Sequence, residues 1–215
     1  MKARYFVICG LLTAGALAAS LLALPHLPDT VPMHWGVNGQ PDGYGSKLAF
    51  ALTLPATMAG LTLLFAVLPS LSPKHFKIDS FMSTYLRVAA AVIGMLAYVQ
   101  VLLLLAGLGR PVNMNRAIPG AICVLIVLIG NVLGKMRRNF FIGIRTPWTL
   151  ADERVWNATH RFGAKVWTIG GAVTFVLTFA TGNLWVFMSA ILITAFTPVV
   201  YSFVFYKKLE RLGEV

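Results

Sequence analysis

Charged residues are scarce in this chain, and carboxylates are the scarcest of them. Asp and Glu number 7 in 215 residues, and all charged residues together amount to 12%. Soluble domains average about 25% charged residues, whereas 58% of this chain is apolar. The composition excludes an ordinary soluble domain and predicts an integral membrane protein.

Cysteine is also rare, which limits disulfide and metal chemistry. The two cysteines, Cys9 and Cys123, each lie inside an apolar run. We therefore expect buried thiols rather than a disulfide or a metal pair. The histidines and carboxylates of residues 26–42 match no ligand spacing of a metal site. The sequence thus predicts no metal and no cofactor.

Familiar arrangements of catalytic residues are missing as well. The chain has no Ser/His/Asp set and no glycine-rich phosphate loop. His160 has only Glu153, two helical turns away, as a nearby acid. We predict a protein that is not an enzyme. One alternative stays open, a membrane enzyme that acts on lipid or cell-wall precursors through His160 and Arg145.

Long apolar segments, in contrast, are plentiful. A bilayer core of about 30 Å needs about 20 residues in a helix, and helices satisfy every backbone polar group within the membrane. We predict an all-α bundle of about six transmembrane helices, although five spans are also compatible because the fifth segment is short. The predicted spans are Tyr5–Leu24, Leu48–Leu68, Tyr85–Leu108, Ile118–Gly134, Val166–Thr181 and Leu184–Tyr206.

Lys and Arg residues collect on one side of these spans. Only Lys47, Arg110 and Arg116 fall on the opposite side. Because cytoplasmic loops retain basic residues, we predict a multi-pass protein of the cell membrane with both termini in the cytoplasm. The first 24 residues imitate a cleavable signal peptide, but an uncleaved first helix better preserves this charge pattern.

The net charge of +11 also predicts partners. In a soluble protein this charge would suggest nucleic acid, but here the basic residues flank membrane spans. Anionic lipid headgroups on the cytoplasmic side are the expected partner, and no direct contact with nucleic acid is predicted. No carboxylate falls inside a predicted span, which argues against a proton-coupled carrier. A transporter of small molecules or lipids stays an alternative, and it would need a polar cavity between spans.

Two polar segments separate the spans more elaborately than simple connections require. The first, residues 24–47, contains four prolines and four glycines, which exclude a long helix and predict a compact loop outside the cell. The second, residues 135–165, holds seven of the 18 Lys and Arg residues. Its polar and aromatic side chains predict a recognition surface on the cytoplasmic side.

A helix start is expected within this second segment. Pro147 excludes a helix running through that point, and the pair Thr149 and Asp152 resembles an N-cap. The following residues alternate as in an amphipathic helix, which we predict to lie in the cytoplasm and to lead into the fifth span. Arg145 is expected either to pair with Asp152 or Glu153 or to bind a carboxylate or phosphate ligand.

Both polar segments resemble known sequences. Residues 31–47, V-P-M-H-W-G-V-N-G-Q-P-D-G-Y-G-S-K, look like the extracellular signature of a bacterial membrane domain of unknown function. Residues 130–163, G-N-V-L-G-K-M-R-R-N-F-F-I-G-I-R-T-P-W-T-L-A-D-E-R-V-W-N-A-T-H-R-F-G, are similar to the C-terminal signature of the SdpI family. The resemblance divides the chain into an N-terminal membrane domain, residues 1–110, and a C-terminal SdpI-like region, residues 111–215.

This resemblance implies a function. In the SdpI family, an immunity protein protects the producing bacterium from a secreted toxic peptide and, with toxin bound, holds a transcriptional repressor at the membrane. The implied protein is a non-enzymatic membrane immunity or receptor-type protein that resists or senses a secreted antimicrobial peptide. The motif matches suggest candidate recognition residues outside, Pro32, His34, Trp35, Gly39, Pro41 and Asp42, and inside, Asn139, Phe141, Gly143, Arg145, Thr146, Pro147, Trp148, Trp156, His160 and Arg161.

Overall fold

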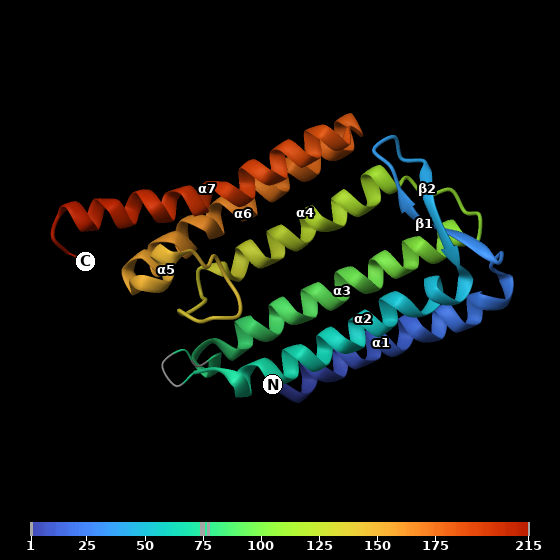
Figure 1. Cartoon of the computed structure of the whole chain (residues 1–215), viewed down its shortest axis with the longest axis horizontal. Helices are drawn as coiled ribbons and strands as arrows, with labels where there is room; N and C mark the ends of the chain where they lie inside the picture. The colour runs from blue at the N-terminus through green and yellow to red at the C-terminus, as the bar shows by residue number, and fades with distance from the viewer. Residues whose placement is uncertain (1, 74–75, 77, 215) are drawn as a thin grey trace.

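The computed structural model describes residues 2–73, 76 and 78–214 and is predominantly helical. Within this part of the chain, six helices are long and apolar enough to cross a membrane, which confirms the predicted all-α multi-pass fold. They form an elongated bundle (Figure 1). The helices are α1 (Lys2–Ala23), α2 (Lys47–Val67), α3 (Met82–Gly107), α4 (Met114–Leu133), α5 (Pro147–Ala151), α6 (Glu153–Thr181) and α7 (Leu184–Arg211), with short 3-10 turns η1 (Leu24–His26), η2 (Leu68–Leu71) and η4 (Ile78–Phe81).

The long helices are arranged in two groups of three. Helices α1, α2 and α3 pack together, and α4, α6 and α7 do the same. The two groups meet along α3 and α4, which lie side by side in the centre of the molecule (Figure 1). The division into regions 1–110 and 111–215 stays a prediction, because helix packing does not test whether either region folds alone.

Local signals explain the tight connection between α6 and α7. Gly182 follows α6 with φ +61°, the left-handed conformation that glycine adopts at helix ends. Asn183 then caps α7, since its Oδ1 accepts a hydrogen bond of 2.8 Å from the Trp185 N–H. The helical hairpin predicted at these two residues is therefore confirmed.

The start of the fifth span differs from the prediction. Helix α6 runs without interruption from Glu153, so the amphipathic segment and the span are one helix of 29 residues. Asp152 caps this helix, because its Oδ1 accepts from the Arg154 N–H at 2.7 Å. The predicted N-cap at Thr149 is wrong. Thr149 belongs to the short helix α5, whose own N-cap is Thr146. A cytoplasmic position for the start of α6 stays a prediction.

The Asp152 cap yields a testable pH dependence. Arg154 lies 2.9 Å from the carboxylate and lowers the pKa of Asp152. A lowered pKa adds stability above the unfolded value of about 3.9, and this contribution is lost as the pH falls through the folded value. We expect Asp152→Ala to cost about 1 kcal/mol at neutral pH, and Asp152→Asn, which keeps a capping oxygen, to cost less. Unfolding titrations at pH 7 and pH 3 measure both variants, and a cost for Asp152→Ala that is unchanged at pH 3 would contradict the assignment.

A β-hairpin connects α1 to α2. Its strands, β1 (Thr30–Trp35) and β2 (Pro41–Ser46), pair antiparallel, with irregular register on either side of His34. Where the strands meet α2, Lys47 Nζ lies 2.8 Å from Asp29 Oδ1 and lowers the pKa of that carboxyl. The prolines and glycines of residues 24–47 predicted a compact loop and excluded a long helix, and the structure forms this loop as a pair of strands. Here both strands are edge strands, where proline is tolerated.

Candidate functional site

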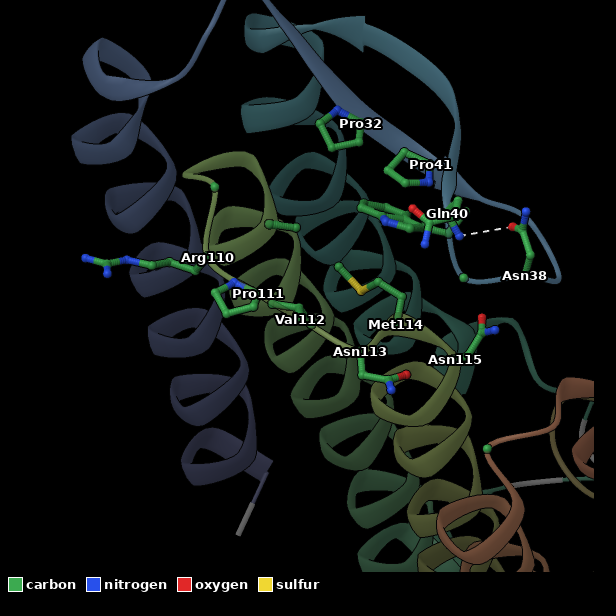
Figure 2. Close-up of a pocket in the computed structure, with 15 residues that line it drawn as sticks. Pro32, Asn38, Gln40, Pro41, Arg110, Pro111, Val112, Asn113, Met114 and Asn115 are labelled. Carbon is green, nitrogen blue, oxygen red and sulfur yellow. Dashed lines mark hydrogen bonds between the residues drawn. The ribbon is translucent and has the colours of Figure 1, made fainter.

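A groove opens between the tip of the hairpin and the connection from α3 to α4. Its volume is about 910 Å³, within the range of about 300–1,000 Å³ typical of ligand pockets. Figure 2 shows Gln40 and Pro41 of the hairpin facing Pro111 and Val112 of the connection. We call this feature the hairpin groove. Its walls belong to residues 32–41 and 106–115, together with Gly182.

Contacts at both ends hold the hairpin over the bundle. Val31 is fully buried and packs into a cluster with Leu27, Phe50 and Leu104. At the tip, the Asn115 side chain at the start of α4 donates a hydrogen bond of 3.0 Å to the Val37 carbonyl. The groove is therefore bounded by an anchored strand pair rather than by a free loop.

The hairpin groove is lined by apolar side chains, side-chain amides and one arginine, Arg110. Proline rings and the Trp35 side chain supply apolar surface, while Asn113, Asn115 and Gln40 supply amide donors and acceptors. No carboxylate is found among the described residues that line it. The Arg110 side chain points away from Gln40 (Figure 2). Polar atoms make up more of this lining than apolar atoms do, so the groove is polar with apolar patches.

A second cavity lies beneath the first, toward the membrane-spanning part of the bundle. It measures about 400 Å³ and extends to Leu54 of α2, Leu103 of α3 and Phe187 of α7. Trp35 and Met114 line both cavities. The Trp35 side chain therefore borders both the polar groove and the apolar cavity.

The structure brings most of the outer candidate residues together. Four of them line the hairpin groove: Pro32, Trp35, Gly39 and Pro41. The other two form an exposed pair across the strands, in which His34 Nδ1 lies 2.5 Å from Asp42 Oδ1. This pair links the two strands of the hairpin and lies beside the groove, outside its lining.

At the opposite end of the bundle lies the signature loop, which we define as residues 135–152. Asn139 is fully buried and organises its first half. Its Nδ2 donates to the carbonyls of Arg137 and Ile142, at 2.8 and 3.0 Å, and its Oδ1 accepts from the N–H groups of Phe141 and Ile142. All hydrogen-bonding positions of this amide are thus used within the loop.

Two stacked rings of α6, those of Trp156 and His160, pack against the signature loop. Trp156 is fully buried, its Nε1–H donates to the Met136 carbonyl at 2.8 Å, and its ring stacks on His160 at 4.0 Å. His160 Nε2 accepts from the Ile144 N–H at 3.0 Å, and Nδ1 lies 2.8 Å from the Trp156 carbonyl. This pattern corresponds to neutral histidine with its proton on Nδ1.

The second half of the loop contacts α7. Thr146 and Thr149 form a capping box, and Thr146 Oγ1 lies 3.0 Å from Ser202 Oγ. Trp148 is half-buried against Phe203, with ring centroids 4.9 Å apart. The loop is therefore attached to α6 by Trp156 and to α7 by two further contacts.

The inner candidates divide by exposure. Asn139, Thr146, Trp156 and His160 are buried, and Phe141 and Trp148 are half-buried. Gly143 has φ +116°, a backbone conformation that residues with a side chain rarely adopt. The side chains that reach solvent are those of Arg145, Pro147 and Arg161. The recognition role of all these residues stays a prediction.

One of the two expectations for Arg145 was an ion pair with Asp152 or Glu153, and the structure does not show it. Among the described residues, the ion pairs of Asp152 and Glu214 both involve Arg154, and neither Asp152 nor Glu153 pairs with Arg145. The internal partner predicted for Arg145 is therefore wrong. Asp152 is directed toward the first turn of α6, where it serves as a cap.

Three residues that hold the signature loop or the hairpin in place were not among the candidates from the sequence. Arg138 donates to the carbonyls of Leu150 and Ala151 at the end of α5 and lies over the Phe76 ring, 5.3 Å from its centroid. Ser202 and Asn115 were also missed. Their partners lie 56 and 78 residues away in the chain, so no local pattern could identify them.

These features define a multi-pass helical membrane protein with an anchored hairpin groove at one end and a buried, hydrogen-bonded loop at the other. The family model for the SdpI/YfhL protein family matches residues 135–202, and one for a domain of unknown function (DUF1648) matches residues 11–59. Immunity protein SdpI of Bacillus subtilis (strain 168) is 30% identical over 193 residues, which are 89% of this chain and 90% of that protein. The chain belongs to the SdpI family. No solved structure matches it significantly.

Proposed function

We propose that this protein is a membrane immunity protein that protects the cell by binding a secreted antimicrobial peptide in the hairpin groove. The observation that carries the proposal is the groove itself, about 910 Å³ in volume and lined by four of the six outer candidate residues. A relative that covers nearly the whole chain is named an immunity protein. Binding and sequestration require no chemical step, so the proposed protein is not an enzyme.

The groove chemistry supports a peptide as ligand. Backbone amides of an extended peptide match the side-chain amides of Asn113, Asn115 and Gln40, and apolar side chains match Trp35 and the proline rings. The apolar cavity below Trp35 offers space for a further apolar side chain. A peptide that damages membranes carries such side chains.

The proposed orientation follows from the basic residues. Lys and Arg concentrate at the end of the bundle that carries both termini and the signature loop. Because cytoplasmic loops retain basic residues, this end lies in the cytoplasm and the hairpin groove faces outward. The basic end then meets anionic headgroups of the inner leaflet.

The signature loop is the proposed docking site for a cytosolic regulator. Arg145 and Pro147 are exposed on this loop, and Arg161 is exposed on the adjoining helix α6. Buried side chains of the loop hold it against the bundle. A rigid loop presents exposed side chains at low entropic cost. In this proposal, peptide binding outside is signalled to a transcriptional repressor inside.

The alternative functions receive less support from the structure. A transporter would need a polar path between spans, whereas Leu54, Leu103 and Phe187 line the cavity below Trp35. A catalytic His160 would need access to substrate, whereas both of its ring nitrogens engage the backbone. We therefore retain peptide immunity as the proposed function.

A survival assay tests the proposal. Cells with and without the protein are challenged with a secreted toxic peptide, and we expect Trp35→Ala to reduce the tolerated concentration to that of cells lacking the protein. Removing an aromatic anchor of an interface costs about 2 kcal/mol or more in binding, which is about 30-fold in Kd. Membrane abundance is measured in parallel by immunoblotting.

Two matched variants locate the effect. Tyr44→Ala removes an exposed aromatic ring of the same hairpin that does not line the groove, and we expect it to protect normally. Arg145→Ala, at the other end of the bundle, should keep protection and lose only regulator recruitment. Equal loss of protection in Trp35→Ala and Tyr44→Ala, at equal abundance, would contradict binding in the groove.

A further inference from the structure

A second groove follows the contact between α3 and α4, away from the hairpin. It consists of two cavities, of about 440 Å³ and about 230 Å³, which share the lining residues Ala91 and Leu128. Phe175 and Phe179 of α6 line it toward the hairpin end. We call the combined feature the lateral groove. Since it follows the seam between the two helix groups, an occupant would contact both.

The larger part of the lateral groove is apolar and opens sideways. Gly94 lies in its wall, and a Cβ placed there would meet no atom within 4 Å. Tyr98, Val124 and Leu128 line the groove and are each exposed by about half of their side-chain surface. In a bilayer these side chains meet lipid, so the groove is accessible to an acyl chain from the membrane.

The smaller part ends at polar side chains. Arg87 of α3 and Asn131 of α4 both line it. Arg87 is exposed, and among the described residues no carboxylate forms an ion pair with it. A guanidinium binds phosphate in a two-pronged geometry and an amide can add a further donor. This end of the groove is therefore complementary to an anion.

The part of the groove between Arg87 and Tyr98 matches one leaflet of a bilayer in length. Tyr98 follows Arg87 by about three helical turns, which corresponds to about 16 Å along α3. Half of a hydrocarbon core of about 30 Å is about 15 Å. A lipid whose headgroup lies at Arg87 would extend one acyl chain past Tyr98, which lies near the bilayer centre.

We propose that the lateral groove is a binding site for one anionic phospholipid, with its phosphate at Arg87 and one acyl chain between α3 and α4. Arg87 lies near the start of α3, at the same end of the bundle as Lys2, which approaches Asp79 to 3.9 Å. The lipid therefore comes from the leaflet on the basic side. Bound there, it bridges the two helix groups and stabilises their contact.

Native mass spectrometry of the purified full-length protein tests this site. The protein is delipidated in detergent and titrated with phosphatidylglycerol or with phosphatidylcholine carrying the same acyl chains. We expect one retained phosphatidylglycerol per protein and weaker retention of phosphatidylcholine. Arg87→Gln should weaken retention of phosphatidylglycerol about tenfold, because a hydrogen bond to a charged group contributes about that much. Arg87→Lys should restore part of it.

The acyl-chain part of the site is tested separately. Gly94→Leu fills the groove and should also reduce retention about tenfold or more, whereas Gly60→Leu places the same side chain at another helix position with no atom within 4 Å and should not. Arg4→Gln removes an exposed cation from the same end of the bundle and serves as the charge control.

Several outcomes would overturn the proposal. Equal retention of the two lipids would overturn the preference for an anionic headgroup, and an equal loss in Arg87→Gln and Arg4→Gln would remove the phosphate site at Arg87. Retention that is unchanged in Gly94→Leu would remove the acyl-chain groove, even if lipid binds elsewhere. The proposal is independent of immunity, because lipid retention is measured without any toxic peptide.

Discussion

Replacing Trp156 by alanine is expected to lower the free energy of unfolding by about 4 kcal/mol. The side chain is fully buried among Leu133, Met136 and Ile144. Its removal leaves a cavity, breaks the stacking with His160 and leaves the Met136 carbonyl without its donor. An orphaned buried acceptor alone costs about 1–3 kcal/mol.

The measurement is unfolding of the purified protein in mixed micelles of a mild detergent and sodium dodecyl sulfate. Trp185→Ala is the matched control, because Trp185 is 69% exposed at the start of α7, and exposed substitutions usually change stability by about 0.5 kcal/mol or less. Trp156→Phe keeps most of the apolar volume and should lose only part of the stability. Equal losses in Trp156→Ala and Trp185→Ala would contradict a structural role for Trp156.

Gly143→Ala is expected to be nearly as destabilising, at about 3 kcal/mol. Gly143 has φ +116°, a conformation that residues with a side chain rarely adopt. A Cβ at this position would lie 2.5 Å from His160 Nε2, the atom that accepts from the Ile144 N–H. The variant must therefore distort the backbone or break the contact between the signature loop and α6.

Two comparisons separate these causes. Gly109→Ala introduces a side chain at φ +74° with no atom within 4 Å, so it reports backbone strain alone, about 1–2 kcal/mol. The double variant Gly143→Ala with His160→Ala removes the clash, and we expect the two costs to be less than additive. Strict additivity, measured by the same unfolding titration, would exclude a direct contact between residue 143 and His160.

Contacts of this kind, between buried side chains and the loop backbone, hold the signature loop in one conformation. Trp156, His160 and Asn139 are all buried, and each accepts or donates hydrogen bonds with the loop backbone. A motif rich in polar and aromatic residues predicts recognition, but most of this motif shapes the loop. Of the inner candidate residues, only Arg145, Pro147 and Arg161 have exposed side chains, and these three are the candidate contacts of the proposed regulator surface.

Features that depend on neighbouring residues could be predicted from the sequence alone. Apolar length determines which segments can cross a bilayer, and this predicted six helices and the all-α class. The hairpin between α6 and α7 follows from Gly182 and Asn183, which end one helix and cap the next. The two signature motifs are contiguous in sequence, and they predicted the SdpI family to which the chain belongs.

Only the tertiary structure decided which side chains face a partner and which face the protein. Asn139 and Arg145 are both polar residues of one motif, yet one is fully buried and the other is exposed. The hairpin groove needs residues 32–41 beside residues 106–115, and the lateral groove needs Arg87 beside Asn131. Helix capping and the length of apolar segments depend on neighbouring residues, so the sequence by itself determined them. Burial and side-chain hydrogen bonding depend on elements far apart in the chain, so only packing decided them.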